Sequence, residues 1–195
     1  YQTTDNIYQI NQYLNNLPDI FAADFETASR FTQIEKQIYS NLNYKNLANS
    51  NGLSHPNLSM ITHLNIAWSE DEALVIICNN ESIRKLITKF LVTTDKLQIW
   101  HNATFDWMHI YYYTKMFPKK YVDTRLLAKS ILNNCDSSKD RVGLKELMGY
   151  AYGDWAIAKE SFNQDNMYDP NLIKYAATDA CATYKLYKEL INESH

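Results

Sequence analysis

The sequence predicts an α/β fold with a mixed sheet of about five strands flanked by helices. Short apolar runs alternate with stretches whose apolar residues recur at helical spacing, which is typical of α/β domains. Two such runs, 60–68 and 73–78, are joined by a short polar turn, which predicts an antiparallel hairpin. The later runs, 97–101 and 121–123, each follow a helical stretch, as strands joined by crossover helices do.

The chain opens with an expected helix at 3–16, because its apolar residues recur at helical spacing and Pro18 would end it. An apolar run with β-prone Ile and Phe predicts the first strand at 19–26. The polar, Asn-rich residues 28–59 then predict a long insertion after this strand, with one helix at 34–42.

The second half of the chain is expected to be mainly helical. The helices predicted after the hairpin lie at 81–91, 104–117, 124–132 and 143–150. Pro118 would end the aromatic-rich second of these, and residues 151–168 are expected to be irregular. Asp169 as N-cap and Pro170 in the first position predict a long final helix that runs to about Ile191.

The composition predicts one globular domain over residues 1–195. Of the 195 residues, 46% are hydrophobic and 21% are charged, and no apolar run approaches the ~18 residues of a membrane span. A net charge of −3 argues against a passive nucleic-acid binder, but not against an enzyme whose acidic residues hold cations. With only 4 Gly, a P-loop or a Rossmann turn is excluded.

The cysteines predict a reducing compartment. Cys78, Cys135 and Cys181 lie far apart and suit neither a disulfide framework nor a zinc site. Because no signal peptide is present, the expected location is the cytoplasm, or the nucleoid and its replisome. An organelle is an alternative, and a viral protein would lie in the host cytoplasm. Because the chain begins at Tyr1 and not at Met, it is expected to be a domain or processed piece of a longer protein.

The first acidic motif is Asp24-Phe25-Glu26 at the end of the first predicted strand. Strand side chains alternate between faces, so Asp24 and Glu26 point to the same side. Two neighbouring carboxylates on one face repel each other unless a cation lies between them. The alternative is a pair of exposed charges at a strand end.

Two further motifs place acids in predicted helices. Asp106 lies in the first turn of a helix that follows a strand, where Asn102 would serve as N-cap or contact a substrate. Tyr175 and Asp179 are four residues apart on one face of the final helix. The alternatives are an acid favoured by the helix dipole and a buried Tyr beside a salt-bridged Asp.

In combination, the three motifs resemble those of the DEDD superfamily of 3′-to-5′ exonucleases, in the subgroup with a catalytic tyrosine. The residues that match its motifs are Asp24, Glu26, Asp106, Asp179 and Tyr175. The runs 101–106 and 175–180 are most similar to the proofreading domain of family A (DNA polymerase I type) polymerases, and ribonuclease D is a near competitor. The resemblance implies a ribonuclease H-like fold.

The resemblance also implies phosphodiester hydrolysis with two divalent metal ions, Mg²⁺ or Mn²⁺, for which carboxylate oxygens are suitable ligands. Asp24, Glu26 and Asp179 would hold one ion, and chiefly Asp24 the other. Asp106 would act partly through bound water. Tyr175 would orient the attacking water, since a phenol with a pKa of ~10 is a poor base.

Four residues are expected to bind substrate. Thr27 follows Glu26 and would touch the terminal sugar or phosphate, beside Asn102. Phe105 would stack on a base or belong to the core. The chain departs from the polymerase pattern at Arg30, where a Leu is usual, and a guanidinium there would stack on a base or hold a phosphate.

The resulting hypothesis is an exonuclease that removes 5′-mononucleotides from single-stranded DNA 3′ ends. It would act in proofreading, with a DNA polymerase domain or subunit as its partner. No association with a membrane is expected. Two alternatives stay open. One is a ribonuclease D-like RNA exonuclease, which would share every catalytic residue. The other is a non-catalytic module that binds a single strand or docks a polymerase.

Overall fold

The computed structural model describes residues 1–42, 55–132 and 162–193. Within this part, one sheet contains six strands in the order β1-β4-β3-β2-β5-β6. Their bounds are β1 Gln2–Thr4, β2 Ile20–Ser29, β3 Ser59–Ala67, β4 Ala73–Ile77, β5 Leu97–Trp100 and β6 Tyr121–Asp123. The pairs β2–β3 and β3–β4 are antiparallel. The pairs β1–β4, β2–β5 and β5–β6 are parallel. The mixed sheet and its hairpin are therefore confirmed.

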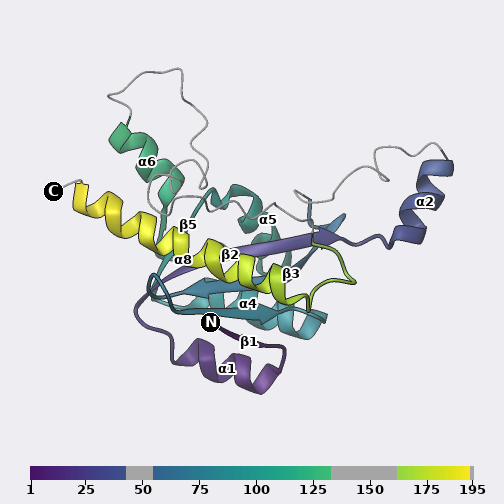
Figure 1. Ribbon diagram of the computed structural model, residues 1–195, viewed down its shortest axis with the longest axis horizontal. Helices are drawn as coiled ribbons and strands as arrows, with labels where there is room; N and C mark the ends of the chain where they lie inside the picture. Colours follow the sequence, from purple (N-terminus) through teal and green to yellow (C-terminus); the bar gives the residue numbers. More distant parts are fainter. Residues whose placement is uncertain (43–54, 133–161, 194–195) are drawn as a thin grey trace.

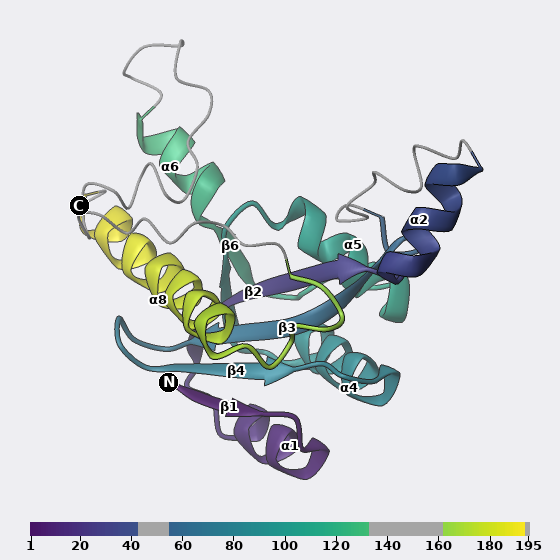
Figure 2. The ribbon, with the colours of Figure 1, turned by 45° about the vertical axis from the view of Figure 1, so that its right-hand side comes forward.

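The helices lie on both faces of the sheet (Figure 1). Their bounds are α1 Ile7–Asn15, α2 Gln33–Asn41, α4 Glu81–Thr93, α5 Ala103–Thr114, α6 Thr124–Leu132 and α8 Pro170–Glu193. Helices α1, α4 and α5 share a core with one face, and α8 covers the other, as the turned view in Figure 2 shows. No helix in the described ranges is long and apolar enough to cross a membrane.

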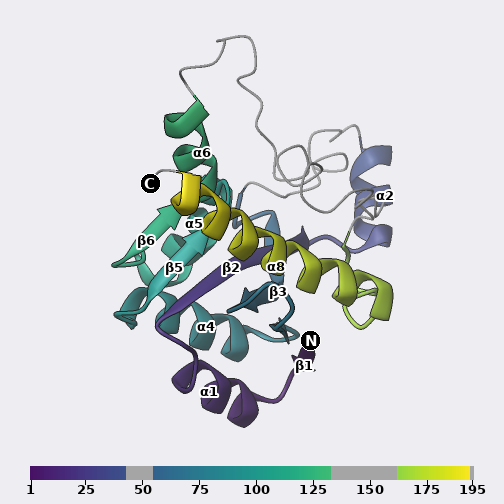
Figure 3. The same ribbon diagram turned by 60° about the vertical axis from the view of Figure 1, so that its left-hand side comes forward.

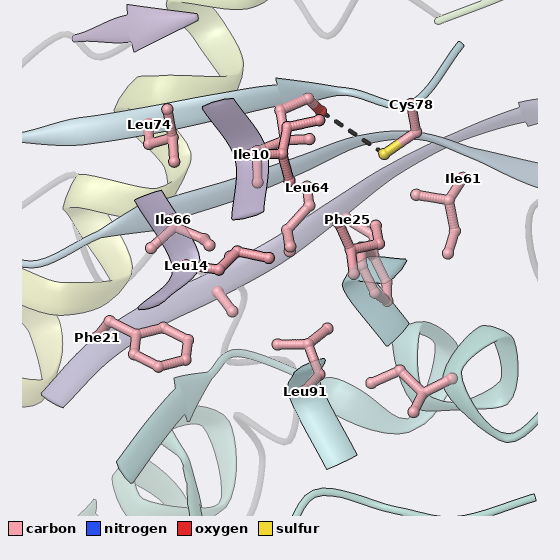
Figure 4. Packing of buried hydrophobic residues seen from close by; sticks show 14 of the residues in the cluster. Ile10, Leu14, Phe21, Phe25, Ile61, Leu64, Ile66, Leu74, Cys78 and Leu91 are labelled. Atoms are coloured by element: carbon pink, nitrogen blue, oxygen red, sulfur yellow. Dashed lines mark hydrogen bonds between the residues drawn. The ribbon is translucent and has the colours of Figure 1, made fainter. Parts of the chain in front are cut away.

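The alternation of β2 creates the two faces of the core. Phe21, Ala23 and Phe25 are buried with the side chains of α1 and α4, as Figure 4 shows for the labelled residues. Ala22, between them, is buried with side chains of α8. Burying a large side chain of this kind stabilises the fold by about 1.5–3 kcal/mol. The same alternation directs the two residues at positions 24 and 26 toward α8.

Several boundaries differ from the predictions for local reasons. The start of the chain forms β1, and α1 begins only at Ile7, because the Asn6 side chain accepts hydrogen bonds from the next backbone amides and caps the helix. Strand β2 runs past Glu26 to Ser29, so the insertion predicted from residue 28 begins two residues later. Helix α5 ends at Thr114, before Pro118, because Lys115 adopts a left-handed conformation.

The other predicted helices are confirmed or fall outside the described residues. The insertion contains α2, which begins with a capping box between Thr32 and Glu35 and lies away from the sheet in Figure 1. The predicted helix at 143–150 lies outside the described ranges, as does Cys135. The described cysteines, Cys78 and Cys181, are free thiols.

Candidate active site

The structure brings the first and third acidic motifs together. Asp24 and Glu26 follow Ala22 on the face of β2 that α8 covers, and α8 lies across β2 and β3 in Figure 3. Asp179 is contributed by α8. One carboxylate oxygen from each of Asp24, Glu26 and Asp179 lies within 4.8 Å of the others. Such a half-buried set of oxygens suits a hard divalent cation.

Asp106 reaches this cluster because β2 is longer than its neighbour β5. The two strands pair only over Ile20–Ala22, and the chain turns after Trp100 into α5. The Asp106 carboxylate accepts a hydrogen bond from the backbone of Phe25, beyond the last paired residue. Burial, followed by the charge of Asp24, raises the pKa of Asp106 well above its usual value. The second motif therefore lies beside the first.

Tyr175 is buried one helical turn before Asp179. Burial raises the pKa of its phenol above the usual value of 10, and the charges of Asp179, Glu26 and Asp24 raise it further. A hydrogen bond with Asp179 acts in the same direction. At neutral pH the Tyr175 hydroxyl therefore keeps its proton. The negative charges of the carboxylates repel one another and oppose ionisation of the phenol, and bound cations would relieve this repulsion.

Asn65 is a site residue that the sequence analysis missed. It is fully buried in β3 directly opposite Asp24. Its Nδ2 donates to Asp24 Oδ2 at 3.4 Å and to Glu26 Oε1 at 3.5 Å, while its Oδ1 is buried without a partner among the described residues. If the Asn65 side-chain amide were rotated by 180°, its oxygen would face the two carboxylates and be repelled by them. The Nδ2 hydrogens must therefore point toward Asp24 and Glu26. The available signal was an amide side chain in a strand that is buried throughout its length.

Replacing Asn65 by Leu is expected to weaken Mn²⁺ and Mg²⁺ binding about tenfold, because groups that orient metal ligands have effects of this size. Leu fills a similar volume and removes the unpartnered oxygen, so the fold should persist. Calorimetric titration of Mn²⁺ would measure the change. Asn57→Leu, at an exposed position before β3, is the control. Unchanged Mn²⁺ affinity in Asn65→Leu would show that the two carboxylates need no orienting donor.

A second residue that the sequence analysis missed, Asp123, organises the turn before α5. Its carboxylate accepts hydrogen bonds from the backbone amides of Asn102 (3.0 Å), Ala103 (2.9 Å) and Arg125 (2.9 Å). Asn102 is left-handed, with φ 57°, and makes no side-chain cap. Its Oδ1 accepts from Arg125 at 2.9 Å instead. The cap predicted for Asn102 is wrong, because an acid of the adjacent strand β6 occupies that role.

Replacing Asp123 by Ala is expected to lower the free energy of unfolding by about 2 kcal/mol, the upper range for a lost helix cap, because three backbone donors lose their acceptor. Asp123→Asn keeps one acceptor oxygen and should lose about half as much. Urea denaturation would measure both variants. Equal stability of Asp123→Ala and the wild type would contradict this function of Asp123.

The predicted substrate-binding residues lie close in sequence to the carboxylates of β2 and α5. Thr27 is half-buried at an irregularity in which Thr62 is the extra residue on β3, and such bulges are common beside active sites. Phe105 is 50% exposed, so the alternative that it belongs to the core is wrong. Arg30 donates through Nε to the Pro56 carbonyl at 2.8 Å. This contact closes the base of the insertion, and a substrate role for Arg30 stays a prediction.

The segment before α8 is tied to the sheet. Gln164 Nε2 donates to the carbonyls of Ser29 and Arg30 at 3.1 and 3.0 Å. The fully buried His63, opposite Glu26 in β3, donates through Nε2 to the Met167 carbonyl at 2.8 Å. These bonds fix the start of α8 against β2 and β3. They thereby set the position of the two α8 side chains of the site.

Comparison with known proteins identifies a matching family and similar folds. A family model described as 3′-5′ exonuclease matches residues 54–194, more than half of the chain. No curated protein sequence matches. NrnC of Brucella melitensis, also solved with bound Mg²⁺, is similar in structure, with a TM-score of 0.66 and 20% identity over 98% of this chain and 80% of NrnC.

Two further solved structures are similar at lower identity. The EXO domain of Aedes aegypti Nibbler has a TM-score of 0.64 and 13% identity, over 98% of this chain and 87% of that domain. Escherichia coli RNase D has a TM-score of 0.64 and 14% identity, over 99% of this chain and 44% of RNase D. These likenesses confirm the ribonuclease H-like fold of the mixed sheet.

Proposed function

The chain belongs to the 3′-to-5′ exonuclease family, and we propose that it hydrolyses RNA from single-stranded 3′ ends and releases 5′-mononucleotides. The observation that supports catalysis most is the carboxylate cluster of Asp24, Glu26 and Asp179, within 4.8 Å of one another. A module that only bound nucleic acid would have no use for acids that repel both each other and the phosphates of its ligand.

Exonucleases of this family use divalent metal ions, and the donor set fits them. Asp24, Glu26 and Asp179 would hold Mg²⁺ or Mn²⁺ together with the adjacent Asp106. When bound, such ions stabilise the charge that develops on the attacking and leaving oxygens of an in-line displacement. All the ligands are hard oxygens, which favours these ions over zinc.

Tyr175 would act by positioning, in the manner of the tyrosine subgroup. Its hydroxyl is held beside Asp179 and keeps its proton at neutral pH, so it cannot act as a general base. It would instead hydrogen-bond the attacking water and fix its direction toward the phosphorus. Thr27 on β2, and Asn102 and Phe105 at the start of α5, would contact the terminal nucleotide.

RNA is favoured over DNA by the structural neighbours. E. coli RNase D is described as an exoribonuclease involved in structured RNA processing, and NrnC has been solved bound to pGG. The sequence-based hypothesis of DNA proofreading shares the same catalytic residues but is not supported by these neighbours. RNA hydrolysis is therefore the leading proposal, and a polymerase domain or subunit as partner stays a prediction.

The test uses 5′-labelled RNA and DNA oligomers of one sequence with Mg²⁺ or Mn²⁺. We expect ladders that shorten from the 3′ end, faster for RNA, and no products with EDTA. Faster decay of DNA would restore the proofreading hypothesis. Binding of either strand without hydrolysis, by folded protein with metal present, would identify a non-catalytic module.

A further inference from the structure

The outer face of α5 differs from that of an ordinary surface helix. A helix of this kind usually presents charged and polar residues to solvent, but α5 presents large apolar and aromatic side chains. Phe105 is 50% exposed, Met108 40%, Tyr111 45% and Tyr112 40%. The one acid of α5 lies on the inner side of the helix, so the outer face contains no carboxylate.

This face begins at the candidate active site. Phe105 directly precedes Asp106, whose carboxylate bonds the backbone of β2. From Phe105 the exposed side chains continue along α5 to Lys115, the residue that ends the helix, which at 1.5 Å per residue is about 15 Å away. That length matches about four stacked nucleotides at 3.4 Å each. Beyond the helix end, the half-exposed Phe117 ring stacks on Tyr111 at 5.3 Å.

Cations lie among these rings. The Lys115 ammonium is 5.3 Å from the Tyr111 ring centroid and 5.9 Å from that of Tyr112. The Arg30 guanidinium approaches Tyr112 at 5.7 Å. Exposed rings that stack on bases, combined with positive charges that attract phosphates, are the features of single-strand binding surfaces. The absence of acids on this face suits a polyanion in the same way.

We propose that the outer face of α5 binds the single strand upstream of the 3′ end that enters the site. This inference rests on the proposed function and extends it to the substrate's length. Bases would stack on Phe105 and on the exposed ring of Tyr112, and Lys115 would contact the backbone. Substrates of about five nucleotides would then bind more tightly than dinucleotides, because only the longer strand reaches Tyr112 and Lys115.

The experiment measures the affinity of RNA oligomers of two, four and eight nucleotides by fluorescence anisotropy, with EDTA present to prevent hydrolysis. Wild-type affinity should rise with length. Tyr112→Ser should bind the eight-nucleotide RNA at least fivefold more weakly, since stacking contributes about 1 kcal/mol or more per base. Lys115→Glu should bind it at least fivefold more weakly as well, because it replaces a positive charge that attracts the phosphates by a negative one. Neither variant should alter dinucleotide affinity appreciably. Both positions are exposed, so circular dichroism should show an unchanged fold.

Tyr8→Ser is the matched control, because Tyr8 is an 80% exposed aromatic residue on α1, which packs elsewhere on the sheet. Wild-type affinity that does not depend on length, or an equal loss in Tyr8→Ser, would overturn the inference. So would a wild-type dimer that Tyr112→Ser dissociates in light-scattering chromatography, because the face would then join two copies. If the wild type degrades RNA but the variants bind RNA of all lengths with normal affinity, only this inference fails. A wild type that neither binds nor degrades RNA would contradict the proposed function itself.

Discussion

Replacing Asp24 by Asn is expected to lower the rate of 3′-end hydrolysis about 10³-fold. Asp24 interacts with every other ionisable group of the site. One of its carboxylate oxygens lies within 4.8 Å of oxygens of Glu26 and Asp179, and its charge raises the pKa values of Asp106 and Tyr175. Metal ions contribute several kcal/mol to such reactions, and each 1.4 kcal/mol is a factor of ten in rate. Initial rates on 5′-labelled RNA at saturating Mg²⁺ would measure the loss.

The same variant is expected to be more stable than the wild type in EDTA. Without cations the carboxylates repel one another, and removal of one charge relieves the others. Mg²⁺ should raise the melting temperature of the wild type, because a ligand that binds only the folded state stabilises it, and should have little effect on the variant. A lower melting temperature for Asp24→Asn in EDTA would show that its hydrogen bonds outweigh the repulsion.

The control is Asp71→Asn, which removes one negative charge from the exposed turn between β3 and β4. It should change neither the rate nor the response to Mg²⁺. A 10³-fold loss in Asp24→Asn with a normal Asp71→Asn would assign the effect to the cluster and not to net charge. Activity close to that of the wild type in Asp24→Asn would exclude Asp24 from catalysis.

Periodicity was sufficient to predict the local part of the site. The alternation of strand side chains placed Asp24 and Glu26 on one face, and the helical repeat placed Tyr175 and Asp179 on another. What brings Asp106 to them is a difference in strand length, because β5 pairs with β2 only up to Ala22. The length of a strand depends on its neighbours in the sheet, so no local pattern specifies it.

The residues that the sequence analysis missed act through tertiary contacts. Asn65 lies opposite Asp24 only because of the antiparallel register of β2 and β3. Asp123 caps α5 from the adjacent strand β6, whereas sequence proximity pointed to Asn102. Strand β1 was overlooked for a similar reason, since three residues, two of them exposed, become a strand only by pairing with β4.

Acidification from pH 7 to pH 5 is expected to destabilise the protein through two buried histidines. His63 and His109 are 0% and 1% exposed, and burial lowers the pKa of each imidazole from 6.5 to about 4. His63 uses both ring nitrogens in the neutral form, toward Thr62 and Met167. The Ser59 hydroxyl donates to the His55 carbonyl, so it accepts from His109 Nε2 at 3.1 Å. The remaining His109 nitrogen is a buried acceptor without a partner among the described residues.

The sign follows from the lowered pKa values. The folded state holds both rings neutral, so their contribution to stability is fully present above pH 6.5 and is lost as the pH falls toward 4. At 1.4 kcal/mol per pH unit, each ring would contribute about 2 kcal/mol less at pH 5. The raised pKa of Asp106 acts in the opposite direction, because this carboxyl takes up a proton in the folded state first. The pH dependence of wild-type stability therefore combines opposing contributions, and a comparison with a histidine variant isolates that of one ring.

His109→Gln can still donate to Ser59 and cannot take up a proton. Between pH 7 and pH 5 its free energy of unfolding, from urea titrations in EDTA, should fall by about 2 kcal/mol less than that of the wild type. A lower stability at pH 7 leaves this comparison intact, because only the difference between the two pH values matters. If the variant and the wild type lose equal stability, then His109 is protonated in the folded protein, and the acid lability must arise at other groups.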